Sequence, residues 1–464
     1  MVFTSARRPR LRHGLLLLVL FALPGCSPRE PGDRVVLITL DTLRFDAVEG
    51  GEGRPTAMPK LKAWGDASTT FDHCFSATST TQPSHASMLT GLHPWQHGLT
   101  RNGQRLPAEL ETVAEHLKAA GWSTSAVVAS FPLSAVFGFD QGFDHYDDHF
   151  DRGQPGTDWR GDAETVAHED GEEDEDGGAQ TPQRFYSLSD SIVDRALALL
   201  DDTDAPRQFL WFHFFDAHAP YGDTGDGPTV TPSQILDRAE EGENVEQAIA
   251  ESHDLYDLDL RFLDQNLARL LERLDEQGDR YRTHVVILAD HGESFGEDGS
   301  LAHGRRLTPG QIHVPCMIRS SLLELGHRSD VVGSIDVADT VLGLAGVDGS
   351  VGHGRDLTRP LDRPARAFGM RRTYRKPYLD RRLDGSVVVL DHNLFYLADR
   401  DGRIYRGNAG MLLAPEPGTA LPEELQKQLS YLFTTFEDEL AGRAPQELTD
   451  DETRKALESL GYTG

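Results

Sequence analysis

Three apolar stretches of the chain each run into an aspartate. They are residues 34–41, 209–216 and 284–290, and they end in Asp41, Asp216 and Asp290. Continuous runs rich in Val, Ile and Phe are typical of parallel strands that are covered on both faces. In open α/β sheets, ligands bind beyond the carboxyl ends of such strands. The pattern therefore predicts that three carboxylates from distant parts of the chain meet at one sheet edge, as a metal site requires.

Helical periodicity separates these apolar stretches. Leucine and valine at three-four spacing predict amphipathic helices over residues 109–120, 187–200 and 252–277. Predicted strands and helices alternate to about residue 345, which is typical of an α/β protein. We therefore expect one large domain over residues 34–364.

The pattern changes beyond residue 365. Short apolar runs over residues 386–390, 394–397 and 403–405 predict strands joined by tight turns. A helical stretch over residues 423–440 and a capping box at residues 449–452 follow. We expect residues 365–464 to form a small α+β subdomain that leans against the main sheet.

The first 25 residues resemble a secretion signal. Arginines at positions 7, 8, 10 and 12 precede an apolar run over residues 14–23, which is shorter than the roughly 20 residues of a membrane-spanning helix. The run leads into Leu23-Pro-Gly-Cys26, which resembles a bacterial lipobox and implies cleavage before Cys26 and lipid attachment to it. We expect a lipoprotein outside the cytoplasm, anchored to a membrane of the bacterial cell envelope through Cys26 and a linker over residues 26–33. A plain secreted protein is the alternative.

The composition is that of an ordinary globular protein, with 38% hydrophobic and 8% aromatic residues. The formal net charge of -30 argues against nucleic acid as a partner, because binding to phosphates depends on Lys and Arg. Acidic residues are concentrated in residues 150–185, which we predict to be a flexible insertion because they hold few apolar side chains. Cys74 and Cys316 accompany Cys26; a secreted protein could join them in a disulfide, and the sequence leaves this open.

A candidate nucleophile lies in residues 80–94. Pro83 suits the first turn of a helix, because its missing N–H needs no partner there. Thr81 is therefore expected just ahead of a helix N-terminus, where free N–H groups and the helix dipole favour anionic oxygen. A hydroxyl held there beside a metal ion can act as a nucleophile. A threonine at such a position can equally serve only as a helix cap.

Four motifs resemble those of sulfatases, which belong to the alkaline phosphatase superfamily, and they occur in the same order. They are LDTLR at residues 40–44, TQPSHASMLTGLHP at 81–94, FDAHAPY at 215–221 and ADHGE at 289–293. The resemblance implies an α/β/α sandwich around a large mixed, mostly parallel sheet, with residues 34–364 as the catalytic domain. It also implies that Asp41, Asp290 and His291 bind a divalent metal ion that touches Thr81.

The resemblance implies roles for further residues. His218 and His303 would contact the transferred group or hold a second metal ion, with Asp216 as a weaker candidate ligand. Asn102 would lie near the same anionic oxygens. His85 stands where sulfatases have an arginine, so it could either orient Thr81 as a general base or simply fill the arginine's place.

Two departures from the sulfatase pattern favour phosphorus chemistry. Sulfatases have Cys or Ser at the position of Thr81 and oxidise it to formylglycine, an aldehyde that threonine cannot yield. A threonine ester must instead be cleaved by water at its central atom, and this resembles the Thr-based phosphodiesterases and phosphoethanolamine transferases of the same superfamily. His291 stands where many sulfatases have Asn, and an imidazole ligand moves the metal preference from calcium towards zinc or manganese.

We therefore expect a metal-dependent hydrolase of phosphate, phosphonate or sulfate esters, with Thr81 as the nucleophile, one or two divalent ions and no formylglycine. The substrate would be a small-molecule, glycan or lipid ester. Three alternatives stay open: a sulfate-ester hydrolase proper, a phosphoryl transferase of the phosphoethanolamine type, and an inactive lipid-anchored binding module.

Overall fold

The computed structural model of the chain describes residues 31–51, 53–150, 185–297, 301–304 and 306–361. Beyond these it describes the backbone of four strands between residues 368 and 408, and the single residues Glu423, Lys427, Thr453 and Leu457. The predicted signal peptide, residues 26–30 of the predicted lipid-anchored linker, nearly all of the acidic insertion and most of the C-terminal helices lie outside the described residues. Residues 32 and 33 of the predicted linker belong to the first strand of the structure.

An eight-stranded sheet forms the centre of the molecule, with the strand order β10-β2-β9-β6-β1-β5-β3-β4. Its strands are β1 (Gly32–Leu40), β2 (Thr69–Phe75), β3 (Ser123–Val127), β4 (His145–Asp147), β5 (Arg207–Phe214), β6 (Tyr281–Ala289), β9 (Cys316–Arg319) and β10 (Gly326–Gly333). Strand β9 is antiparallel to both of its neighbours, and the other pairs are parallel. The expected large mixed, mostly parallel sheet is confirmed.

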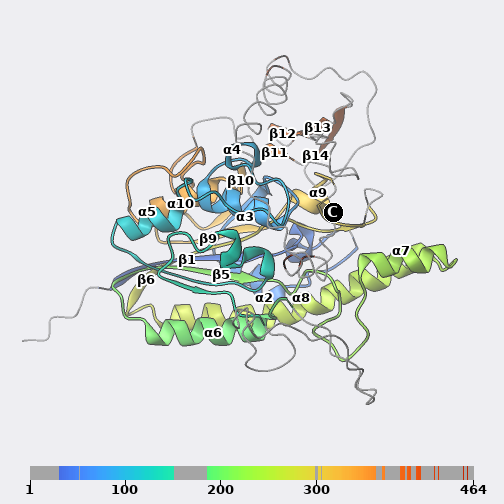
Figure 1. The fold of residues 1–464 in the computed structure, drawn as a ribbon, viewed down its shortest axis with the longest axis horizontal. Helices are drawn as coiled ribbons and strands as arrows, with labels where there is room; N and C mark the ends of the chain where they lie inside the picture. The colour runs from blue at the N-terminus through green and yellow to red at the C-terminus, as the bar shows by residue number, and fades with distance from the viewer. Residues whose placement is uncertain are drawn as a thin grey trace, which may run out of the picture.

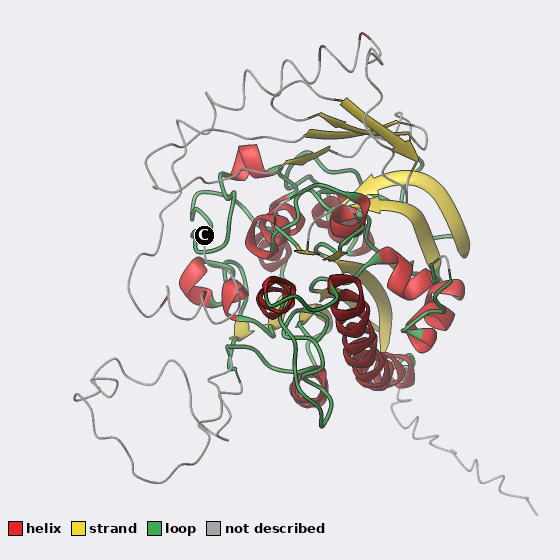
Figure 2. Cartoon of the chain, turned by 90° about the vertical axis from the view of Figure 1, so that its right-hand side faces the viewer, coloured by secondary structure: helices red, strands yellow, loops and turns green. Residues whose placement is uncertain are grey.

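Helices cover both faces of this sheet, which confirms the predicted α/β/α sandwich (Figures 1 and 2). One face carries α3 (Thr81–Thr90), α4 (Pro94–His97), α5 (Val113–Ala119), α9 (Pro309–Ile312) and α10 (Asp336–Leu344). The opposite face carries α2 (Pro59–Asp66), α6 (Ser189–Asp202) and α8 (Val245–Glu276). The short α1 (Phe45–Glu49) follows β1, and α7 (Pro232–Glu240) leads into α8.

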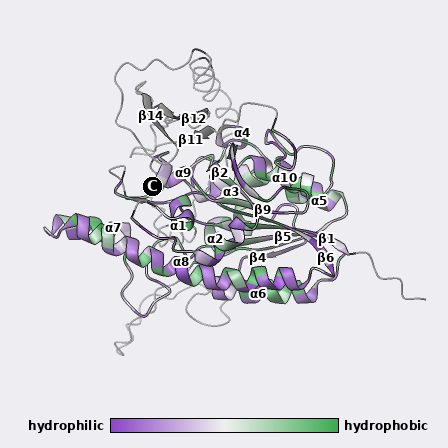
Figure 3. Ribbon diagram, turned by 180° about the vertical axis from the view of Figure 1, so that it is seen from behind, coloured by the Kyte–Doolittle hydropathy of each residue, from purple (hydrophilic) through white to green (hydrophobic). Residues whose placement is uncertain are grey.

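The predicted helices are present, and capping side chains explain where they begin. Helix α5 starts later than expected, because the Thr112 side chain accepts a hydrogen bond from the N–H of Glu115 in a capping box. Helix α8 starts earlier, because the Asn244 side chain caps its first turn. Figure 3 shows hydrophilic and hydrophobic residues side by side along α6 and α8, as amphipathic helices require. None of the helices among the described residues is long and apolar enough to span a membrane.

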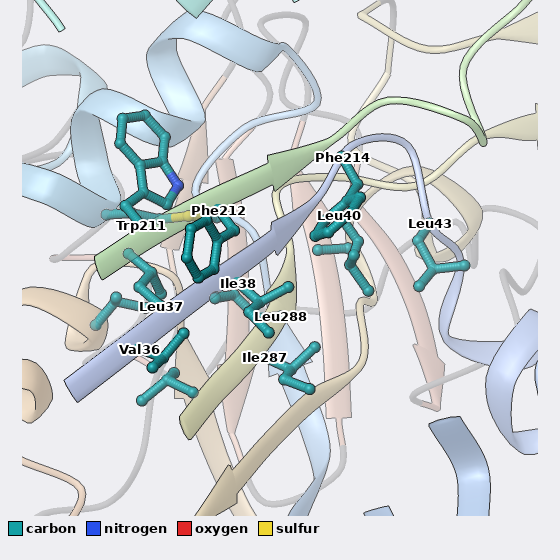
Figure 4. Packing of buried hydrophobic residues seen from close by; sticks show 14 of the residues in the cluster. Val36, Leu37, Ile38, Leu40, Leu43, Trp211, Phe212, Phe214, Ile287 and Leu288 are labelled. Atoms are coloured by element: carbon teal, nitrogen blue, oxygen red, sulfur yellow. The ribbon is translucent and has the colours of Figure 1, made fainter. Parts of the chain in front are cut away.

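The three strands that predict the site lie side by side at the centre of the sheet. Strand β1 pairs in parallel with β5 on one side and with β6 on the other. Their apolar side chains pack into one buried core (Figure 4). Leu40, at the end of β1, stands in register with Phe214 of β5 and Ala289 of β6. The residues that follow these three positions therefore emerge together at the carboxyl edge of the sheet.

A separate four-stranded antiparallel sheet follows in the C-terminal part of the chain. Its strands are β11 (Phe368–Met370), β12 (Val387–Asp391), β13 (Leu394–Ala398) and β14 (Ile404–Asn408). The three short strands expected from the sequence correspond to β12, β13 and β14. A two-stranded ribbon, β7 (Ser294–Phe295) with β8 (Leu301–Ala302), lies after β6. Cys74 and Cys316 are both buried and are not joined in a disulfide.

Candidate active site

Asp41, Asp290 and His291 come together at the carboxyl edge of the sheet. Each offers one ligand atom, and these atoms all lie within 4.8 Å of one another. All three side chains are buried. Asp41 directly follows β1 and Asp290 directly follows β6, so the parallel pairing of the two strands places the carboxylates side by side. This is the group that the resemblance to sulfatases implies as a metal site.

Thr42 links the two carboxylates. Its N–H donates a hydrogen bond of 3.1 Å to Asp290 Oδ1, and its hydroxyl donates one of 2.6 Å to Asp41 Oδ1. The φ angle of Thr42 is 61°, in the left-handed region that residues other than glycine rarely adopt. Such strain is often found at functional sites, where the surrounding structure holds the backbone in place.

The free oxygens of the two carboxylates fit a bound cation. Asp41 Oδ2 and Asp290 Oδ2 are buried, and neither has a hydrogen-bond partner among the described residues. Burying such an atom without a partner is costly, so a metal ion is the group that would satisfy both. Burial and the charge on Asp41 raise the pKa of Asp290. Burial also acts to raise the pKa of Asp41, but the imidazoles of His213, His291 and His218 outweigh it and lower that pKa.

The tautomer of His291 supports the same interpretation. Its Nδ1 lies 3.0 Å from the carbonyl oxygen of Gly292, which can only accept, so Nδ1 carries the proton. The unprotonated Nε2 then lies 3.4 Å from Asp290 Oδ2 and 3.8 Å from Asp41 Oδ1. Burial and the nearby His303 lower the pKa of His291, which favours the neutral ring that a metal ligand needs.

Thr81 reaches this group from helix α3. It is the first residue of α3, and its Oγ1 lies 3.4 Å from His291 Nε2. Asn102 holds the same helix end, because its Oδ1 accepts a hydrogen bond of 2.9 Å from the N–H of Gln82. Asn102 Nδ2 is buried and has no hydrogen-bond partner among the described residues. An N–H donor is therefore left next to Thr81, as an anionic substrate oxygen would require.

His85 has both of its ring nitrogens engaged away from the Thr81 hydroxyl. Its Nδ1 lies 2.9 Å from the carbonyl oxygen of Thr81, and its Nε2 lies 3.1 Å from the hydroxyl of Thr39. Burial and the neighbouring His213 lower the pKa of His85 to about 3. Of the two roles predicted for His85, the geometry fits the one that fills the arginine's place and does not fit a general base on Thr81.

His218 and His303 lie next to His291. The ring centroids of His291 and His303 are 4.4 Å apart, and those of His218 and His303 are 4.9 Å apart. The Nδ1 atoms of His218 and His303 face the carbonyl oxygen of Ala219 at 2.7 Å and the carboxylate of Glu293 at 3.3 Å. Each Nε2 is then the unprotonated atom. Within the described part of the chain, no second metal-ligand group forms around these two histidines.

Asp216 does not join the cluster of ligand atoms. Its Oδ1 accepts hydrogen bonds from both the N–H and the hydroxyl of Ser189, at 3.0 and 2.6 Å. Ser189 begins α6, on the face of the sheet opposite α3. Since Leu40 pairs with Phe214, Asp41 is in phase with Phe215, and Asp216 falls on the other face. The structure therefore places Asp216 apart from the three-ligand group, with one oxygen at the start of α6, and its role as a metal ligand stays a prediction.

Asp216 gives the protein a pH-dependent stability that the Asp216→Asn variant should lack. Burial raises the pKa of Asp216 to about 7, although the hydrogen bonds from Ser189 lower it. The folded state therefore holds a proton that the unfolded state loses near pH 4, so its stability falls as the pH rises from about 4 to about 7. Between pH 5 and pH 8, the free energy of unfolding of the wild type should fall relative to that of the variant by roughly 2 kcal/mol. Urea unfolding of both proteins measures this difference, and an equal change in both would contradict it.

One residue of the site, His213, was not predicted. It is buried in β5, and its Nε2 lies 3.4 Å from Asp41 Oδ2. Strand register could have predicted it, because His213 pairs with Thr39 of β1 and therefore faces the same side of the sheet as Asp41. The aspartates are visible in the sequence as the ends of apolar runs, whereas the direction of His213 depends on the alternation of side chains within β5.

Comparison with known proteins agrees with this architecture. A family model described as Sulfatase matches residues 33–347. The choline-sulfatase of Rhizobium meliloti (strain 1021) is 24% identical over 348 residues, which are 68% of this chain and 67% of that protein. The ulvan-active sulfatase of Formosa agariphila is 24% identical over 380 residues, 75% of this chain and 71% of that protein. A solved structure of phosphonate monoester hydrolase from Silicibacter pomeroyi has a TM-score of 0.64 at 18% identity, covering 90% of this chain and 100% of that one.

The fold is therefore that of the alkaline phosphatase superfamily, and the chain is an ester-hydrolysing enzyme. It belongs to the sulfatase family. Members of this family depend on a metal ion, and Asp41, Asp290 and His291 are residues of this chain that could hold one.

Proposed function

We propose that this enzyme hydrolyses phosphate or phosphonate esters with the help of a divalent metal ion, and that Thr81 is its nucleophile. The observation that carries the proposal is the position of the Thr81 hydroxyl, 3.4 Å from His291 Nε2 at the edge of the three-ligand group. A hydroxyl beside a metal site at a helix N-terminus is arranged for attack on an electrophilic centre.

The identity of residue 81 as threonine also favours phosphorus esters over sulfate esters. A sulfatase with formylglycine releases sulfate by breaking a C–O bond, and threonine has no such route. Here Thr81 Oγ1 would form a bond to the central atom as the ester oxygen leaves, and water would then attack the same atom to release Thr81. Two successive displacements at one centre suit phosphorus, and this is why we favour phosphate and phosphonate esters over sulfate esters.

The other residues of the site have roles that follow from their partners. Asp41, Asp290 and His291 would hold the cation, and a bound divalent ion would stabilise negative charge that develops on oxygen. The imidazole ligand favours zinc or manganese over calcium. Asn102, with its unpartnered N–H group, would donate to a non-bridging oxygen of the substrate, and His218 and His303 would contact the same group. His85 would fix the backbone carbonyl of Thr81.

The kind of substrate is proposed from the relatives. Their names include a choline-sulfatase and an ulvan-active sulfatase, and a phosphonate monoester hydrolase shares the fold. We propose a small-molecule or glycan ester on this basis. A lipid ester, and a location at the bacterial cell envelope, would follow from the lipid anchor predicted on Cys26, which lies outside the described residues.

A substrate panel tests this function. Purified protein loaded with manganese or zinc is assayed with an aryl phosphate, an aryl phosphonate monoester and an aryl sulfate of the same leaving group. We expect the larger kcat/KM for one of the phosphorus esters. A preference for the aryl sulfate would identify a sulfate-ester hydrolase instead. Product formation that requires an added alcohol acceptor would indicate a transferase, and metal binding without turnover of any ester would indicate a binding module.

A further inference from the structure

His213 is the buried histidine whose position relative to the metal site calls for an explanation. It is the seventh residue of β5 and stands in register with Thr39 of β1. Its ring lies edge-on to that of His85, with the centroids 5.1 Å apart. The side chain is 0% exposed. A polar ring is therefore held rigidly beneath the carboxyl edge of the sheet, where it cannot reach solvent.

The partner of Nδ1 determines the tautomer of this ring. Nδ1 lies 3.1 Å from the N–H of Ala129, which can only donate, so Nδ1 must accept and carries no proton. In the neutral ring, the proton is then on Nε2. Nε2 lies 3.4 Å from Asp41 Oδ2, and neither atom has a hydrogen-bond partner among the described residues. A buried donor and a buried acceptor thus face each other at the outer limit of a hydrogen bond.

We propose that His213 is a positioning residue for the metal site: its Nε2–H orients the Asp41 carboxylate, and the Ala129 N–H holds the ring in the tautomer that makes this possible. The other oxygen of the same carboxylate, Oδ1, accepts from the Thr42 hydroxyl at 2.6 Å. With both contacts made, Asp41 would be oriented at both oxygens by donors that are not metal ligands themselves. Carboxylate ligands are commonly oriented in this way, and loss of the orienting group typically weakens metal binding by about 10- to 100-fold.

The same geometry indicates that His213 is not itself a metal ligand. A metal ion would need the lone pair of Nε2, and the Ala129 N–H keeps the proton of the neutral ring on that atom. His213 is accordingly outside the group of close ligand atoms, which consists of Asp41, Asp290 and His291. The inference rests on the proposed metal site and adds to it the residue that supports its first carboxylate.

Two substitutions test this proposal, and each keeps one of the two hydrogen-bonding functions of the His213 ring. In the His213→Gln variant, the amide N–H can reach the position of Nε2 and donate to Asp41, but the acceptor for Ala129 is lost. In the His213→Asn variant, the shorter amide can accept from Ala129 but cannot reach Asp41. The measurement is the dissociation constant for Mn²⁺, determined by chelator competition, together with the melting temperature of each metal-free protein.

We expect the His213→Asn variant to bind Mn²⁺ about 10- to 100-fold more weakly than the wild type, and the His213→Gln variant to stay within about threefold. His284→Asn is the matched control, because His284 is a buried histidine of strand β6 in the same sheet, and its Nδ1 lies 2.7 Å from Ser320 Oγ. The affinity of the His284→Asn variant for Mn²⁺ should equal that of the wild type.

Other outcomes would overturn a particular part of the account. If wild-type protein binds no Mn²⁺ or Zn²⁺, the metal site itself is wrong. If the wild type binds Mn²⁺ and the His213→Asn variant binds it equally well, the metal site stands and the positioning role of His213 fails. Weakening of both variants in proportion to their loss of melting temperature would mean that His213 only supports the fold.

Discussion

Replacing Thr81 with alanine is expected to reduce turnover of the preferred phosphorus ester by at least about 10⁴-fold, the scale seen when a covalent nucleophile is removed. The alanine variant keeps Asp41, Asp290 and His291, so its affinity for the metal ion should change by no more than about threefold. Helix α3 should also persist, since Thr80 and not Thr81 is its N-cap residue. The loss would therefore lie in kcat, measured at saturating substrate and metal.

Thr81→Ser is the control for this substitution. Serine keeps the hydroxyl and removes one methyl group, so we expect turnover within about 100-fold of the wild type. If the alanine and serine variants were both as active as the wild type, Thr81 would be excluded as the nucleophile and would serve only in the helix terminus. If the alanine variant lost metal binding and the serine variant kept it, the hydroxyl would be a ligand on which the site depends.

Replacing Asp290 with asparagine is expected to abolish metal binding and turnover while leaving the metal-free fold intact. Burial and the charge on Asp41 raise the pKa of Asp290, so replacing this carboxyl with a neutral amide disturbs the metal-free fold less than at an unperturbed carboxylate. Asparagine keeps the oxygen that accepts from the N–H groups of Thr42 and His291. Its amide N–H would face His291 Nε2, which lies 3.4 Å from Asp290 Oδ2. Turnover should fall by at least about 10³-fold, as expected when a catalytic metal ion is lost.

Thermal unfolding with and without metal measures this effect. At a metal concentration 100 times the dissociation constant, the wild type should gain about 2.7 kcal/mol of stability, and the Asp290→Asn variant should gain none. The metal-free variant should melt at or above the temperature of the metal-free wild type, because the buried Oδ2 atom of Asp290, which has no hydrogen-bond partner among the described residues, is replaced by an amide N–H donor. Asp264→Asn is the control: this buried carboxylate accepts from the N–H groups of Lys60 and Leu61 in α2, and its loss should leave metal stabilisation unchanged. Metal stabilisation that survives in the Asp290→Asn variant would show that the ion binds elsewhere.

The fold could be predicted from the sequence because its elements carry strong local signals. The apolar runs that became β1, β5 and β6 are buried on both faces, so their hydrophobicity is continuous and easy to recognise. Parallel neighbours bring their carboxyl ends to one edge, and Asp41 and Asp290 directly follow two such ends. For this reason, the first two residues of the candidate metal site could be placed together before any coordinates were considered.

The sequence leaves side-chain direction at the site open, because a run of apolar residues does not reveal it. Asp216 and Asp41 both follow strands, but they are out of phase by one residue, and Asp216 faces α6 instead of the ligand group. His213 is in phase with Asp41, and this becomes visible only when the register of β1 against β5 is known. The partners of His85 are likewise set by the packing of α3 against Thr39 of β1, which no local pattern specifies.

The most direct test of the central claim is to trap the reaction at Thr81. The protein is mixed with an excess of an aryl phosphonate or phosphate ester, and the reaction is quenched in acid within milliseconds. The protein is then digested, and the mass of the peptide that contains Thr81 is measured by mass spectrometry. The account predicts a phosphonyl or phosphoryl group on Thr81 that forms as fast as the aryl alcohol is released and disappears at the rate of turnover. Rapid turnover with Thr81 unmodified at every time point, or with the label on another residue, would contradict it.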